Sequence, residues 1–491
     1  MLFNSIEFLI FLPAVFLLYW FVFNRSLKWQ NFFVVFVSYI FYGWWDWNFL
    51  LLIALTSFCS WLSGVWMGDR DGCPSSIRGL RGHRLFVMVA NIVLNFAILG
   101  YFKYYNFFVE SFVHAFHSIG MTVHPQALKI ILPVGISFYT FQALSYSIDV
   151  YRGHIKPTRD PVIFFAYVSY FPQLVAGPIE RATNLLPQFQ SPRSFSYPEA
   201  VDGCRQMLWG FFKKMVVADN CAVAADKLLN GSGNLSGIAL WVGMFCFSIQ
   251  IYGDFSGYSD IAIGCSKLFG VKIMRNFAYP YFSRDIAEFW RKWHISLTTW
   301  FRDYLYIPLG GSYCSVPKQV RNIFVIFLVS GFWHGANWTF IAWGLLHACY
   351  FLPLLMLNRN RKYTGVVAEN QNLPTWTEFV QMSVTFGLVL LAWTFFRAPD
   401  MAHAFSWLAS MATFKGGLAP LFDGTLRLTG LRLILFWVAG MVACEWVNRR
   451  GLHGLANMPQ QKVLRWSIYL LLFFIVLIFK ASRQAFIYFQ F

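Results

Sequence analysis

Two histidines lie in one aromatic-rich part of the chain, between residues 276 and 346. His294 belongs to the run FWRKWHIS, and His334 belongs to the run GFWHGANW. Histidine exchanges a proton near neutral pH, because its unperturbed pKa is about 6.5. A polar side chain in an apolar segment is costly unless it is solvated or used. We therefore treat both histidines as candidate proton-transfer residues.

Other polar and aromatic residues near the histidines are candidate binding residues. Asn337 can donate a hydrogen bond to a substrate carbonyl, and Arg291 can attract an anionic substrate. Trp290, Trp293 and Trp333 can form the walls of a binding site. Each residue also has a structural interpretation, because tryptophans pack helices or lie at membrane interfaces and arginines mark the inner surface. For the tryptophans we favour packing, and for Arg291 both interpretations stay open.

Two carboxylates follow a predicted membrane span at 235–252. They are Asp254 and Asp260 in the run GDFSGYSD, which also contains Tyr258. Carboxylates beside an apolar run either mark a proton or cation path or serve as helix caps and loop anchors. The sequence leaves both possibilities open. The nine cysteines are scattered without a CxxC pair, so we predict neither a zinc site nor a disulfide framework.

The surrounding pattern predicts how the histidines are positioned. Ser283 is a candidate N-cap with Asp285 in the first turn of a helix that continues past Phe301, and His294 falls at the border of its apolar face. Basic residues on both sides of 322–357 predict a hairpin or re-entrant pair with His334 near the turn.

The composition identifies a polytopic membrane protein. Hydrophobic residues make up 57% of the 491 residues and charged residues 12%, whereas soluble domains carry about 25% charged residues. The formal net charge is +17, but the basic residues form short clusters between apolar runs. Such clusters are topology signals, so we expect no nucleic-acid partner.

We expect an all-α membrane domain over residues 1–491. The apolar runs predict about ten to twelve crossings of roughly 20 residues each. Prolines and glycines interrupt the pattern between 161 and 270, which predicts re-entrant segments there. The basic loop 68–84 and the segments around Arg25 and Lys28 are expected on the cytoplasmic side.

Six motifs, in order along the chain, resemble the membrane-bound O-acyltransferase superfamily, and within it the branch that acetylates alginate in bacteria. They are PVGISFYTFQALSYSIDVYRG (133–153), YFPQLVAGPIER (170–181), QIYGDFSGYSDIAIG (250–264), FWRKWHISLTTWFRDYLYIPLGG (289–311), GFWHGANWTFIAWGLLHA (331–348) and the terminal FIYFQF.

The resemblance implies a helical ring around a central tunnel in the bacterial inner membrane. A thioester donor, acetyl-CoA or another acyl thioester, would enter from the cytoplasm, and an extracytoplasmic acetyltransferase partner would pass the acetyl group to a polysaccharide acceptor. No permanently bound cofactor and no metal are implied. The resemblance assigns His334 as the catalytic histidine and His294 as the second functional histidine.

The chemistry of acyl transfer agrees with these roles. Moving an acyl group to a hydroxyl requires a base for the hydroxyl proton and stabilisation of an oxyanion. The chain has no G-x-S-x-G elbow, which favours direct transfer over a covalent serine intermediate. Alternatives are D-alanyl or peptidoglycan acyl transfer by the same machinery, or a transporter or scaffold subunit of a polysaccharide export complex. A transporter predicts two related halves, which we do not find in the sequence.

Overall fold

The computed structural model describes residues 1–68, 78–122, 128, 130–175, 177–230, 236–417, 430–481, 484, 486 and 487. Part of the basic loop 68–84 and most of the terminal FIYFQF motif lie outside these residues. The described chain is helical and contains no strand, which confirms the all-α prediction. It divides into two compact units. Unit 1 is Met1–Ala200 with Cys265–Met274, and unit 2 is Val201–Gly264 with Arg275–Phe491.

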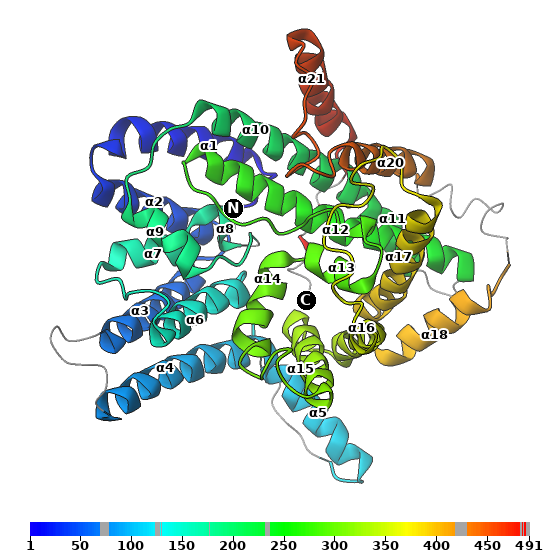
Figure 1. Ribbon diagram of the computed structural model, residues 1–491, viewed down its shortest axis with the longest axis horizontal. Helices are drawn as coiled ribbons and strands as arrows, with labels where there is room; N and C mark the ends of the chain where they lie inside the picture. Colours follow the sequence, from blue (N-terminus) through cyan, green and yellow to red (C-terminus); the bar gives the residue numbers. More distant parts are fainter. Residues whose placement is uncertain are drawn as a thin grey trace. The chain divides into compact units, whose positions relative to one another are not determined.

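Unit 1 consists of long helices followed by short ones. The long helices and the turns attached to them are α1 (Ile6–Leu17), η1 (Leu18–Val22), η2 (Phe23–Arg25), α2 (Leu27–Gly43), η3 (Trp47–Phe49), α3 (Leu50–Met67), α4 (Arg78–Leu99), η4 (Gly100–Tyr104), α5 (Tyr105–Ser118) and α6 (Ile136–Arg152). The short helices are α7 (Pro161–Ser169), α8 (Phe171–Leu174) and α9 (Ala182–Gln190). Helices α3, α4 and α6 pack against one another (Figure 1).

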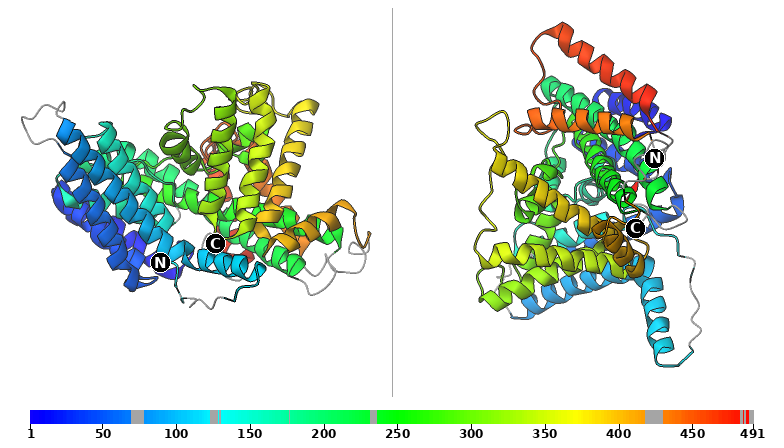
Figure 2. Two further views of the ribbon diagram at one scale, coloured as in Figure 1. Left: turned by 90° about the horizontal axis from the view of Figure 1, so that it is seen from below. Right: turned by 90° about the vertical axis from the view of Figure 1, so that its right-hand side faces the viewer.

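Unit 2 contains the segment with both histidines. Helix α10 (Tyr197–Phe211) enters it, and its other helices are η5 (Phe212–Ala218), α11 (Asp219–Leu229), α12 (Gly237–Leu268), η6 (Pro280–Phe282), α13 (Ile286–Lys292), α14 (Ile295–Phe301), η7 (Arg302–Tyr306), α15 (Val316–His334), α16 (Trp338–Met356), α17 (Trp376–Arg397), α18 (Met401–Ala412), α20 (Leu431–Val447) and α21 (Lys462–Phe479). Helices α15, α16 and α17 run side by side (Figure 2, left).

Seven helical stretches in the described chain are long and apolar enough to cross a membrane. They are Ile6–Arg25, Trp47–Met67, Gly82–Ser118, Gly237–Leu268, Trp338–Met356, Trp376–Arg397 and Lys462–Phe479. The protein is therefore a multi-pass membrane protein. Helices α2, α6, α15 and α20 have 17 to 19 residues and fall outside this set. The central tunnel stays a prediction.

Helix α12 differs from the sequence prediction. We expected a span at 235–252 followed by a polar segment, but the helix continues unbroken for 32 residues, which is about 48 Å. Asp254, Tyr258 and Asp260 therefore lie inside a helix and do not cap one. The helix packs closely against its neighbour at a glycine, since a Cβ on Gly257 would lie 2.8 Å from the Gly210 carbonyl oxygen. Small residues allow such an approach of two backbones.

The helix expected from Ser283 to beyond Phe301 is broken. Asp285, not Ser283, caps α13, and its carboxylate accepts the Glu288 N–H at 2.7 Å. The Ser283 hydroxyl donates instead to the Pro280 carbonyl. Helix α13 ends at Lys292, and a second helix begins at Ile295. The amphipathic pattern is continuous, but the tertiary contacts of the two residues between the helices override it.

Candidate functional site

His334 is the last residue of α15, at the turn of the α15–α16 hairpin. This is the hairpin that the basic residues at both ends predict. Gly331 lets the two helices approach closely, because it has no side chain. A Cβ at this position would lie 2.3 Å from the Phe340 carbonyl oxygen. The imidazole is 5% exposed, and its ring centroid lies 4.9 Å from Trp333, 5.2 Å from Trp343 and 5.4 Å from Phe396. An aromatic wall therefore surrounds the first candidate histidine.

His294 occupies the break between α13 and α14. Its backbone is left-handed, with φ +44° and ψ +54°. A non-glycine residue holds this conformation only where its surroundings fix it. Here the Ile295 N–H donates to the Asn276 carbonyl at 2.9 Å, and the Ala278 N–H donates to the Lys292 carbonyl at 3.0 Å. The segment 276–278 thus fixes the chain on both sides of His294.

Asn276 also fixes the protonation pattern of the His294 ring. Its side-chain oxygen lies 3.0 Å from His294 Nδ1 and accepts the hydroxyl of Ser296 at 3.0 Å. The same oxygen accepts the Ser296 N–H at 3.3 Å, so it is an acceptor, and Nδ1 must carry the proton. Nε2 is then the nitrogen with a lone pair. Sequence reasoning missed Asn276, although it lies in the same segment as both histidines.

Burial keeps His294 neutral. The side chain is 1% exposed and lies outside the seven candidate spans. This burial lowers the pKa of His294 to about 3. The neutral ring can accept a hydrogen bond from a hydroxyl through Nε2, but it binds a proton weakly. His294 is therefore better suited to orienting a hydroxyl than to being the base.

The structure brings the two histidines together. Their ring centroids are 6.5 Å apart, and the ring of Trp333 lies 6.1 Å from His294 and 4.9 Å from His334. One small polar group can contact both imidazoles at this separation. The arrangement can thus hold an acceptor with one hydroxyl donating to the orienting nitrogen of His294 while another gives up its proton to His334.

The tryptophans pack among themselves in the described structure. Trp293 lies 5.4 Å from Phe289 and 5.3 Å from Trp393, while Trp290 donates from Nε1 to Nδ1 of His347 at 3.3 Å. All of these side chains are buried. We did not predict His347 from the sequence. Its position four residues after Trp343 on α16 places both on one helix face, and that spacing was the available signal.

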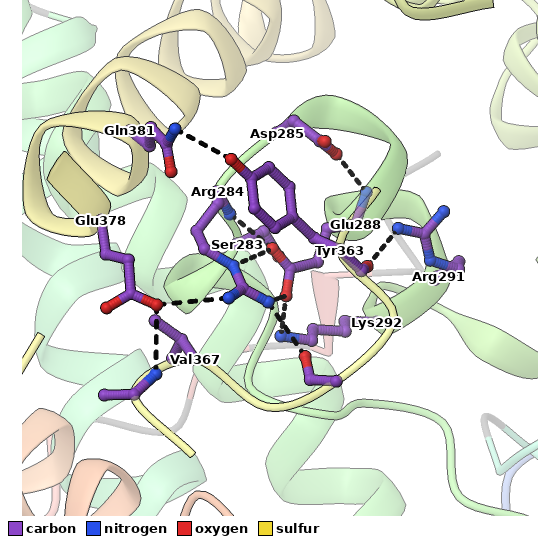
Figure 3. Close-up of polar contacts among 12 residues, drawn as sticks. Ser283, Arg284, Asp285, Glu288, Arg291, Lys292, Tyr363, Val367, Glu378 and Gln381 are labelled. Carbon is purple, nitrogen blue, oxygen red and sulfur yellow. Dashed lines mark hydrogen bonds and ion pairs between the residues drawn. The ribbon is translucent and has the colours of Figure 1, made fainter. Parts of the chain in front are cut away.

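Arg291 belongs to a charged cluster at α13 that Figure 3 shows in close-up. Its guanidinium donates to the Tyr363 carbonyl at 2.5 Å, as Figure 3 shows, and to the Asn360 carbonyl at 2.7 Å. Arg284 and Lys292 both pair with Glu288, at 3.0 and 2.7 Å. Burial raises the pKa of Glu288, but its hydrogen bonds to Arg284 and Lys292 outweigh burial and hold the pKa below its usual value. In this arrangement Arg291 holds the 358–375 loop.

Asn337 is the N-cap of α16. Its side-chain oxygen accepts the Thr339 N–H at 3.0 Å, and its amide nitrogen donates to the Pro399 carbonyl at 3.0 Å. A hydrogen bond to a substrate carbonyl would require the second contact to break. The described structure therefore gives Asn337 a capping role beside His334.

Asp254 and Tyr258 belong to a different cluster in unit 2. Asp254 pairs with Lys214 at 2.7 Å and accepts the Ile487 N–H at 2.7 Å. The Tyr258 ring lies 5.0 Å from Phe486. This cluster adjoins the histidines through Phe255, whose ring centroid is 4.6 Å from His294 and 6.1 Å from Phe486.

Comparison of the sequence with known proteins supports one family. Residues 158–391 match the membrane-bound O-acyltransferase family. A probable alginate O-acetylase of Pseudomonas aeruginosa is 39% identical over 94% of this chain and 83% of its own length. The peptidoglycan O-acetyltransferase of Helicobacter pylori is 33% identical, with 85% of this chain and 80% of that protein covered. The teichoic acid D-alanyltransferase of Streptococcus thermophilus is 27% identical over 59% of this chain and 75% of its own.

These relatives and the histidine pair lead to one conclusion. The names of these relatives refer to different polymers, namely alginate, peptidoglycan and teichoic acid, but each relative is named as an acyl-group transferase or acetylase. The family match spans both histidines, and the alginate relative covers nearly the whole chain. The chain therefore belongs to the membrane-bound O-acyltransferase family and is an O-acyltransferase.

Proposed function

We propose that the protein transfers an acetyl group from a cytoplasmic thioester across the inner membrane for O-acetylation of an extracytoplasmic, alginate-like polysaccharide. The observation that carries the proposal is the pair of buried histidines 6.5 Å apart within a chain 39% identical to a probable alginate O-acetylase. The donor is acetyl-CoA or another acyl thioester. We further propose an extracytoplasmic acetyltransferase partner that completes the transfer to the polymer.

The proposed step balances without a cofactor. His334 takes the proton of the acceptor hydroxyl as the oxygen attacks the thioester carbonyl, and the Nε2 lone pair of His294 accepts a hydrogen bond from a neighbouring hydroxyl of the acceptor and so orients it. The tetrahedral intermediate collapses, the C–S bond breaks, and the thiolate leaves. His334 returns the proton to the thiolate, so that ester and thiol are the products. No covalent enzyme intermediate is needed.

The test uses inverted membrane vesicles that contain the full chain. Radiolabelled acetyl thioester is added outside, and both thioester consumption and label reaching the lumenal polymer are measured. Consumption with label in the polymer supports the proposal. A transporter would move substrate without consuming the thioester, and a scaffold would do neither. Deleting the partner alone is expected to abolish polymer acetylation.

A second test concerns the role of Asn276. We expect Asn276→Leu to lower the transfer rate about tenfold, because the His294 ring loses the hydrogen bond that fixes its tautomer. Asn276→Asp keeps an acceptor for Nδ1 and should retain more of the rate. The measurement is initial rate at saturating thioester, with membrane protein level determined in parallel.

The matched control is Asn220→Leu. Asn220 donates to the backbone carbonyls of Val216 and Phe479, so the substitution also removes amide hydrogen bonds but leaves the histidines alone. If Asn276→Leu and Asn220→Leu lower the rate per folded molecule equally, Asn276 is a structural residue only.

A further inference from the structure

Unit 1 contains a basic cavity that the acyl-transfer proposal does not use. Its volume is about 480 Å³, and it lies between the segment that follows α9 and the C-terminal end of α12. Three cationic side chains, Arg193, Lys267 and Lys272, line it together with a single carboxylate, Glu199. The lining residues also include the hydroxyls of Ser191 and Ser194. The charge of the lining thus favours an anion.

Arg193 is a buried cation that the described protein does not neutralise. It is 8% exposed, and its guanidinium donates to the side-chain oxygens of Gln30 at 2.9 Å and Asn31 at 2.7 Å. These acceptors are neutral, as is the Gln188 carbonyl at 3.4 Å, and Nε has no hydrogen-bond partner among the described residues. A buried charge without a counter-charge is costly, so an anion in the adjoining cavity would stabilise it.

Aromatic contacts hold Arg193 in place. Its guanidinium carbon lies 5.6 Å from the centroid of Tyr19 and 5.1 Å from that of Phe189. These ring contacts, together with the hydrogen bonds to Gln30 and Asn31, fix the position of the guanidinium of this cavity residue. Lys272 pairs with Glu199 at 3.4 Å, but both side chains are solvent-accessible, and such a pair is weak.

The position of the cavity in unit 1 indicates which anions can reach it. The Trp20 indole donates to the Leu268 carbonyl at 2.9 Å, which places Lys267 at the same end of unit 1 as Arg25. The positive-inside rule assigns that end to the cytoplasm. Phe195 and Tyr197 beside the cavity are 48% and 72% exposed, as aromatic residues are at a membrane interface.

We propose that this cavity binds a phosphate group at the cytoplasmic interface. Arg193, Lys267 and Lys272 provide the charge, and the serine hydroxyls provide further donors to phosphate oxygens. The phosphate belongs either to the headgroup of an anionic lipid or to a soluble organic phosphate. The two sources share the recognition chemistry and differ in whether an acyl chain follows.

The experiment measures binding to the purified full chain in a neutral detergent. Native mass spectrometry compares phosphatidylglycerol with phosphatidylcholine, and calorimetry measures coenzyme A against dephospho-coenzyme A. Preference for phosphatidylglycerol identifies a lipid site. Binding of coenzyme A that weakens without the 3′-phosphate identifies a soluble phosphate. Both experiments measure binding and not acyl transfer. A failure of the phosphate-binding proposal is therefore distinguishable from a failure of the acyl-transfer proposal.

Variants that remove positive charge from the cavity test the proposal directly. The double variant Lys267→Gln/Lys272→Gln is expected to bind the identified ligand at least tenfold more weakly. Lys272 is exposed and Lys267 is half-buried, whereas Arg193 is buried, so this variant is expected to fold even if Arg193→Gln does not. The matched control, Lys28→Gln/Lys156→Gln, removes two exposed lysines of unit 1 outside the cavity and should bind normally. The proposal is overturned if neither anionic ligand binds, or if the two double variants bind alike.

Discussion

Replacing His334 by alanine is expected to abolish polymer acetylation and leave the protein folded in the membrane. General-base catalysis contributes about 100-fold to 10,000-fold in rate, and His334 is the histidine that we assign this role. The rings of Trp333, Trp343 and Phe396 pack around the His334 ring, so its loss creates a cavity among aromatic side chains. The measurement is acetyl transfer per folded molecule in vesicles.

The control for this variant is another histidine of unit 2. His403 on α18 pairs with Asp400 at 2.8 Å, and both side chains are more than half exposed. His403→Ala should therefore retain the parental rate. His334→Gln keeps a polar side chain of similar length but cannot exchange the proton, and it should be as inactive as His334→Ala. Substantial transfer by either His334 variant would make this histidine a packing residue.

The largest expected effect on folding comes from Lys214→Met. Lys214 Nζ lies 2.7 Å from Asp219 and 2.7 Å from Asp254, and its side chain is 8% exposed. Removing the cation leaves two buried carboxylates without a counter-charge. Breaking a buried ion pair in this way lowers the free energy of unfolding by about 3 to 5 kcal/mol. We expect a strongly lowered melting temperature in detergent and little protein in the membrane.

Two comparisons separate lost charge from lost packing. Lys214→Met combined with Asp219→Asn and Asp254→Asn removes the unpaired charges together, and it should regain much of the lost stability. Lys272→Met removes one side of an exposed pair with Glu199, and a surface pair is worth about 0 to 1 kcal/mol. A Lys214→Met protein that melts like Lys272→Met would show that the cluster contributes little to folding.

The structure places Asp254 and Asp260, the two carboxylates whose role the sequence left open, in buried ion pairs. Asp260 pairs with Lys213 at 2.6 Å and accepts from Gln206 at 2.8 Å, while Asp254 pairs with Lys214 at 2.7 Å. The lysines come from η5, 40 or more residues earlier in the chain. Sequence spacing alone could not bring these residues together, because the pairing depends on how α10 and η5 pack against α12.

The amino-acid sequence is sufficient to assign the membrane class, the helical fold and the candidate catalytic residues. Hydrophobic composition and run length are properties of the chain that need no tertiary contact. His294 and His334 stand out because each interrupts an aromatic, apolar run with a titratable group. The hairpin around His334 also followed from local signals, since basic residues at both ends fix the direction of the chain.

The contacts that the candidate residues make depend on tertiary packing. The pattern from Ser283 to Phe301 is that of one helix, but hydrogen bonds from segment 276–278 break it at His294 and turn the residue into a left-handed conformation. Arg291 and Asn337, candidate binding residues in the sequence, hold backbone carbonyls. These outcomes depend on partners distant in the chain, and local periodicity carries no information about which distant polar groups a side chain will meet.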